Sequence, residues 1–91
     1  MDLDRLLTLI RDGESERVEF KRAPSRTIHR EIAALTNAEG GHIIIGVDDS
    51  SNIVGTDVKA ALEMVTSALS SIVPPPQITT RKLSVNDRDL L

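Results

Sequence analysis

The sequence predicts an α+β fold, an α/β sandwich in which a mixed β-sheet packs with about three helices. Three features of the 91 residues support this prediction. Apolar residues recur at helical spacing in separate stretches, a continuous apolar run marks a central strand, and shorter alternating runs mark further strands. The expected element order is α-β-α-β-β-α-β, followed by one more β if Leu90 and Leu91 begin a strand.

The chain opens with a helix and a strand. Residues 3 to 12 predict an amphipathic helix, because their apolar positions share one face, and Gly13 suits its C-terminal cap. From residue 17 to residue 22 the pattern changes to strict alternation, which predicts a half-buried strand. Its apolar face carries Val18 and Phe20, and its charged face carries Arg17, Glu19 and Lys21.

A second helix and the central strand follow. Pro24 and Ser25 break the first strand and start a helix that Gly40 and Gly41 end. Its core stripe is Ile28, Ile32 and Leu35, and another face carries Arg26, Arg30 and Asn37. The apolar run from 42 to 47 is typical of a strand covered on both faces. The strands flanking this helix are expected to be parallel, through a right-handed crossover.

The second half of the chain predicts a short partner strand, a helix and a terminal hairpin. A polar turn over 48 to 52 leads to a strand over 53 to 55, and residues 58 to 72 predict a helix capped by Thr56 or Asp57. Three prolines, at 74 to 76, then favour an extended linker. Residues 78 to 85 alternate as a strand, with a turn over 86 to 89. We expect one domain over 1–91, truncated at its C-terminus or completed by another molecule.

Composition excludes several classes of function. Aromatic residues make up 1% of the chain, which argues against stacking of splayed bases. There is no cysteine, and His29 and His42 have no paired-ligand spacing, so we expect no zinc site. The acidic N-terminus resembles neither a signal peptide nor a membrane span, so we expect a soluble, cytoplasmic protein.

Charge is distributed unevenly. The net charge is −3, yet the window from 17 to 30 holds five bases and one acid, 5 − 1 = +4, and the remainder sums to −7. Local sign decides where a phosphate can bind. The sequence therefore predicts a phosphate-backbone site made of five residues, Arg17, Lys21, Arg22, Arg26 and Arg30. The alternative is a solvated basic face that pairs with the acidic remainder.

Five short motifs carry a family likeness: Glu14-Ser15, Val18-Glu19-Phe20-Lys21, Thr36 to Gly41, Ile45 to Asp49, and Ile53-Val54-Gly55. Over residues 12 to 85 the chain resembles the Schlafen-type Alba-like domain. The resemblance implies an Alba-like fold and a DNA-binding role in proteins classed as transcriptional regulators. Members usually continue for several tens of residues more, which agrees with a truncated domain.

In Schlafen relatives the resemblance also implies an RNA-cleaving site of three carboxylates. By position these are Glu14, Glu19 and one of Asp48 or Asp49, with Asp48 preferred. Such clusters hold Mg²⁺ or Mn²⁺. Strand geometry argues against the site, because four or five residues at about 3.3 Å each would separate Glu19 and Asp48 by roughly 15 Å. The alternative is surface acids and a turn.

The expected function is therefore a nucleic-acid-binding module of a transcriptional regulator, with DNA as the preferred partner and no catalysis or cofactor. One alternative is a metal-dependent nuclease core. A second is an interaction module, in which the open edge of the last strand pairs with a second copy or with missing C-terminal domains.

Overall fold

The computed structural model of this chain describes residues 2–25, 27–37, 40–73, 76–85 and 88–91. In these ranges the elements are α1 (Leu3–Asp12), β1 (Val18–Lys21), α2 (Ile28–Asn37), β2 (His42–Ile45), α3 (Val58–Leu69), β3 (Leu83–Val85) and β4 (Arg88–Leu90). The predicted mixed α+β class is confirmed. Arg26 and the expected turn residues Asn86 and Asp87 lie outside the described residues.

The strands form two pairs that meet at one point. β1 and β2 are parallel, as predicted, with Glu19 opposite Ile43 and Lys21 opposite Ile45. β3 and β4 are antiparallel. The two pairs are joined because Ile45 and Leu91 exchange both backbone hydrogen bonds, at 3.0 and 3.1 Å. The single mixed sheet expected from the sequence is thus two short ladders joined by one residue pair.

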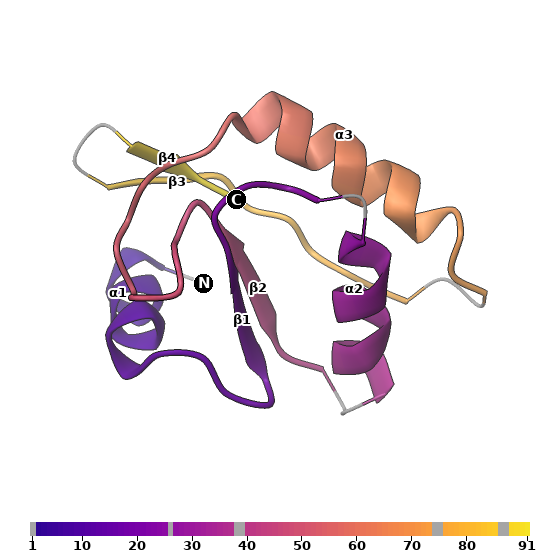
Figure 1. Cartoon of the computed structure of the whole chain (residues 1–91), viewed down its shortest axis with the longest axis horizontal. Coiled ribbons are helices and arrows are strands. Elements are labelled where there is room, and N and C mark those ends of the chain that lie inside the picture. Colours follow the sequence, from indigo (N-terminus) through magenta and orange to yellow (C-terminus); the bar gives the residue numbers. More distant parts are fainter. Residues whose placement is uncertain (1, 26, 38–39, 74–75, 86–87) are drawn as a thin grey trace.

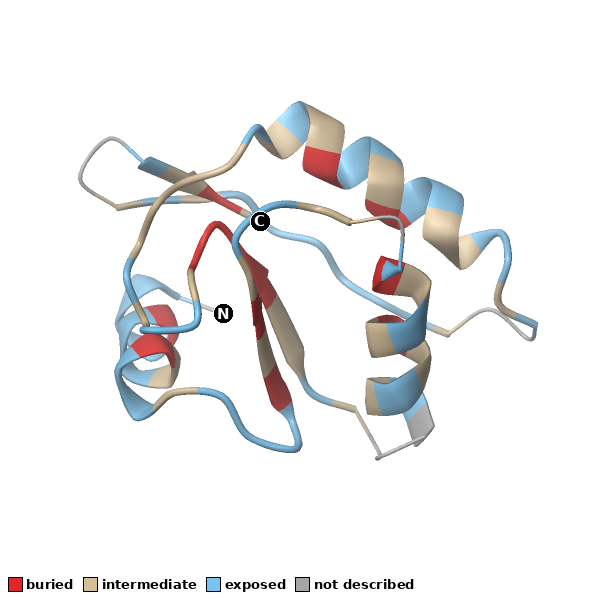
Figure 2. Cartoon of the chain, viewed as in Figure 1, coloured by how far each residue is buried: buried red, intermediate tan, exposed pale blue. Residues whose placement is uncertain are grey.

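Helices cover both faces of the β1–β2 pair, with α1 on one face and α2 and α3 on the other (Figure 1). Alternation along β2 sends Ile44 into the α1 cluster and Ile45 into the α2–α3 cluster. The expectation of a central strand covered on both faces is therefore confirmed. Buried positions follow both strands and the inner sides of the helices (Figure 2).

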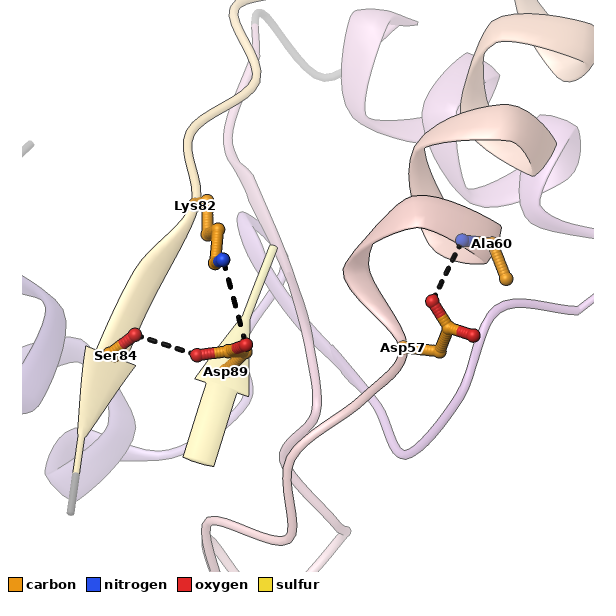
Figure 3. A network of polar contacts seen from close by, with 5 residues as sticks. All are labelled: Asp57, Ala60, Lys82, Ser84 and Asp89. Carbon is orange, nitrogen blue, oxygen red and sulfur yellow. Dashed lines mark hydrogen bonds and ion pairs between the residues drawn. The ribbon is translucent and has the colours of Figure 1, made fainter. Parts of the chain in front are cut away.

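The third helix starts as predicted and ends early. The Asp57 carboxylate caps it by accepting a hydrogen bond from the Ala60 amide at 3.1 Å (Figure 3). It ends at Leu69 rather than at residue 72. The Ser70 hydroxyl donates to the Ser67 carbonyl at 2.7 Å, and the Ser71 hydroxyl donates to the Ala68 carbonyl at 2.8 Å. These side-chain bonds give the last carbonyls of the helix partners in place of the backbone amides of a further turn.

The predicted partner strand over 53 to 55 is reduced to a single bridge between Val47 and Ile53. The chain reverses in the turn over 48 to 52, where the Asp48 amide donates to the Asn52 carbonyl at 3.0 Å. Gly46, just after β2, has a φ of +112°, and its carbonyl accepts both the Val54 and the Gly55 amides of the returning arm. The segment from 47 to 53, the β2 hairpin, therefore folds back beside the strand pair instead of extending it. The later strand is also shorter than predicted, because it begins only at Leu83.

β4 is enclosed on both sides. Toward β3, Asp89 accepts a hydrogen bond from the Ser84 hydroxyl at 2.6 Å and pairs with Lys82 at 3.6 Å (Figure 3). On its other side the Asp89 carbonyl accepts the Thr56 amide at 2.9 Å. The edge of this last strand, which the sequence suggested would be open, is thus partly covered.

Within the described ranges, no helix is long and apolar enough to cross a membrane.

Candidate functional site

The polar face of β1 carries an ion pair with α2. Lys21 donates to Glu31 of α2, and both side chains are about four-fifths buried, with 22% and 20% of their surface exposed. The hydrogen bond to Glu31, helped by the charges of Glu31, Glu19 and Glu14, raises the pKa of Lys21 against the opposing effect of burial. Lys21 is therefore engaged inside the molecule, and it does not project outward as a ligand for phosphate.

Next to this ion pair, two of the predicted carboxylates meet. Glu14, in the loop before β1, is within hydrogen-bonding reach of the Glu19 carboxyl. Loss of hydration raises the pKa of Glu14, and the charges of Glu19 and Asp49 and the hydrogen bond to Glu19 raise it further, while the Phe20 amide lowers it. The third acid near Glu14 is thus Asp49, which folds back in the β2 hairpin.

Asp48, the residue preferred from the sequence, has a structural role in the hairpin. Its carboxylate accepts hydrogen bonds from the Ser50 and Asn52 amides, both at 2.9 Å, and from the Asn52 side chain at 3.2 Å. The Asn52 amide in particular, with the other two donors and the charge of Arg22, lowers the pKa of Asp48. These bonds fix the carboxylate within the turn and use most of its acceptor positions.

The carboxylates do not form a metal site as they stand. Across the described residues, no three acidic or histidine side chains are placed to hold one ion. Loss of hydration first, and then the charges of Glu19 and Asp49, raise the pKa of Glu14, which is the behaviour of an acid placed beside other acids. The Mg²⁺ or Mn²⁺ chemistry implied by the resemblance therefore does not fit this arrangement.

The predicted basic residues divide into different environments. Arg22 at the end of β1 and Arg30 on α2 are exposed, as is Arg17 before β1. The Arg17 carbonyl accepts the His42 amide at 2.7 Å, which fixes the backbone at the start of the strand pair. Arg22 lies close enough to Asp48 for its charge to lower the pKa of that acid. Arg26 falls outside the described part of the chain.

Sequence reasoning missed Glu31 as part of this site. Glu31 is the acid in the first turn of α2, and no spacing in the sequence connects it with Lys21. Sequence reasoning also preferred Asp48 to Asp49, although the polar turn and the returning Ile53 together indicate that the segment folds back.

These features define a small α+β domain whose parallel strand pair displays a charged face. The chain belongs to the family described as Schlafen, AlbA_2, whose model matches residues 14–91. The match confirms the resemblance seen in the motifs and suggests a nucleic-acid-related domain. No curated protein and no solved structure matches the chain significantly.

Proposed function

We propose that this domain binds nucleic acid, with duplex DNA as the preferred ligand, as the recognition module of a transcriptional regulator. The observation that carries the proposal is the family match over residues 14–91. The exposed Arg17, Arg22 and Arg30 supply the positive charge, because guanidinium groups bond phosphate oxygens in forked geometry. Arg26 is included in this set on the basis of the sequence alone.

Lys21 is left out of the binding surface. Its ammonium would have to leave Glu31, whose Oε2 atom is buried without a hydrogen-bond partner among the described residues. Separating a partly buried pair leaves an uncompensated charge, so the cost would exceed the gain from one phosphate contact. The remaining arginines contact the backbone and contribute orientation more than sequence preference.

Fluorescence anisotropy across a salt series tests the proposal, with duplex DNA, single-stranded DNA and structured RNA as ligands. Each phosphate contact contributes about −0.9 to the slope of log affinity against log salt on duplex DNA. Arg22→Glu and Arg30→Glu should each weaken binding and flatten that slope by about one contact. Arg5→Glu on α1, outside the matched range, makes the same charge change, and it should alter both the affinity and the salt slope less than Arg22→Glu or Arg30→Glu does.

Two results would contradict the proposal. One is the absence of binding to all three ligands at low salt. The other is equal weakening by Arg5→Glu and Arg22→Glu, which would indicate a response to net charge alone.

The approach of Glu14, Glu19 and Asp49 favours a second candidate, an RNA-cleaving core. It would require these acids to rearrange around Mg²⁺ or Mn²⁺, since their side chains are not placed to bind one ion together in this structure. Structured RNA incubated with either cation should then be cut by the parent chain and not by Glu19→Ala. Cleavage that persists in both Glu19→Ala and Asp49→Ala would eliminate this candidate.

A further inference from the structure

The segment that leads from β1 into α2 is strongly basic. Residues 22 to 30 contain three arginines, Arg22, Arg26 and Arg30, and no acid. Arg22 and Arg30 fall in the described ranges, and both are exposed. This segment, the basic crossover, therefore holds three of the four arginines of the proposed nucleic-acid site.

The part of the basic crossover that precedes α2 makes few polar contacts. The Ile28 amide donates to the Ser25 carbonyl at 3.2 Å, and the hydroxyl groups of Ser25 and Thr27 lie 3.2 Å apart. Both contacts stay within the segment. Among the described residues, no hydrogen bond or ion pair joins residues 22–25 or Thr27 to the rest of the molecule. The shape of the crossover therefore depends on how its two ends are held.

The two ends are held by the Lys21–Glu31 ion pair. Lys21 is the residue directly before the basic crossover, and Glu31 is the residue directly after it. Both elements also pack on β2, but α2 buries its apolar side chains against β2 and α3, whereas the buried side chains of β1 pack with α1 on the other face. In the described part of the chain, no other hydrogen bond or ion pair joins β1 to α2. The pair thus fixes the spacing between the adjoining ends of these two elements.

The carboxylate of this pair has little other support. Its Oε2 atom is buried and has no hydrogen-bond partner among the described residues. Loss of Lys21 would therefore leave Glu31 without the polar contact that orients it, and loss of Glu31 would release the Lys21 ammonium.

We infer that Lys21 and Glu31 are positioning residues for nucleic-acid binding, which fix the spacing of Arg22 and Arg30 without touching the ligand. This inference rests on the proposed function. A loop that is already ordered loses less conformational freedom when it binds, so the pair raises affinity by ordering the crossover before the ligand arrives. Arg22 follows Lys21 directly and Arg30 precedes Glu31 directly, so a change in the pair moves both arginines.

Two substitutions of opposite charge test this role. Lys21→Gln removes a positive charge and Glu31→Gln removes a negative one, so a response to charge alone would weaken duplex DNA binding in the first and strengthen it in the second. We expect both to bind about three- to tenfold more weakly at about 0.15 M salt, where the Debye length of about 8 Å limits the effect of one charge. Lys21→Arg keeps a cation opposite Glu31 and should retain the parent affinity.

Matched variants separate positioning from charge and from stability. Glu63→Gln on α3 removes an exposed acid outside the crossover and should not weaken binding. Ile10→Val, in the cluster packed under α1, lowers stability modestly without touching the crossover and should bind as the parent does. If Glu31→Gln does not fold, Glu31→Leu makes the same charge change and leaves no polar group unpaired on α2.

A distance measurement reports positioning without any ligand. The chain has no cysteine, so spin labels at Ala23→Cys in the crossover and Lys59→Cys on α3 attach only at those exposed sites. The distribution of distances between the labels should broaden in Glu31→Gln and keep the parent width in Glu63→Gln. Tighter duplex binding by Glu31→Gln, or an unchanged distribution in that variant, would overturn the positioning role and leave the proposed function standing. Absence of binding by the parent chain would remove both.

Discussion

Lys21 of β1 and Glu31 of α2 form an ion pair that holds the polar face of the strand against the helix. The pair explains why the side chain of a lysine on an apparently exposed strand face is about four-fifths buried. Lys21, the most central base of the predicted patch, is thus bonded inside the domain and contributes to its stability. The candidate ligand contacts come from the other bases of the patch.

Lys21→Met should destabilise the fold by about 1 to 3 kcal/mol, because Glu31 would remain partly buried without a partner. Lys21→Met combined with Glu31→Leu should recover much of this loss, since both charges are then absent. Urea denaturation measures each variant. Lys82→Met breaks the exposed pair with Asp89 and serves as the control, with little expected change. Equal losses in Lys21→Met and Lys82→Met would show that burial does not govern the pair.

Glu14 should make stability depend on pH in a defined direction. Its pKa is raised in the folded chain, so the folded state binds the proton more tightly and stability from this group increases as pH falls. Glu14→Gln mimics the protonated acid. The variant should melt above the parent at neutral pH, and the difference should shrink as pH falls through the raised pKa toward the ordinary value.

Thermal denaturation from neutral to acidic pH follows that difference. Glu16→Gln removes the same charge two residues away, at another exposed position, and should not reproduce the trend. A parent that melts above Glu14→Gln at neutral pH would contradict the proposed repulsion with Glu19 and Asp49.

Local patterns were sufficient to predict much of this fold. The first helix spans 3 to 12 as its apolar spacing predicts, and the alternating residues of β1 and the isoleucine run of β2 pair in parallel as expected. These features depend on neighbours in the chain, where periodicity and propensity act directly. The Asp57 cap likewise depends on atoms three residues away.

The candidate site was harder to predict because its contacts join distant segments. Lys21 meets Glu31 only after α2 packs over the strand pair, and no spacing in the sequence encodes that contact. The sequence predicted a polar turn over 48 to 52, but it did not indicate that this turn brings the charge of Asp49, rather than that of Asp48, to bear on Glu14.

Asp48 and Asp49 should respond oppositely to removal. The hydrogen bonds from Asn52 and Ser50 lower the pKa of Asp48, so its contribution to stability is present above the ordinary pKa and is lost as pH falls through the lowered one. Asp48→Ala should therefore lower the melting temperature by a few degrees at neutral pH and have a smaller effect in strong acid. Asp49→Ala relieves repulsion on Glu14 and should leave the melting temperature unchanged or raise it. Thermal denaturation of both variants tests this prediction. A larger fall in melting temperature for Asp49→Ala than for Asp48→Ala would contradict the structural role given to Asp48.

Gly46 should tolerate no side chain. Gly46 and Gly13 both have positive φ, +112° and +87°, so alanine at either position costs about 1 to 2 kcal/mol in backbone conformation. At Gly46 a Cβ atom would also lie 2.6 Å from Leu90 Cδ2 and 3.2 Å from the Gly55 carbonyl carbon, whereas at Gly13 nothing lies within 4 Å. Overpacking should then add about 1 to 3 kcal/mol at Gly46 alone.

A double-mutant cycle in urea isolates the steric part of that loss. Leu90→Ala removes the contacting methyl group at the cost of a cavity, since Leu90 is only 1% exposed. The double variant of Gly46→Ala and Leu90→Ala should therefore lose less stability than the sum of the two single variants, because the overlap is counted once. Additive losses, or equal losses for Gly46→Ala and Gly13→Ala, would mean that the tight approach of β4 to this turn does not restrain the hairpin that carries Asp48 and Asp49.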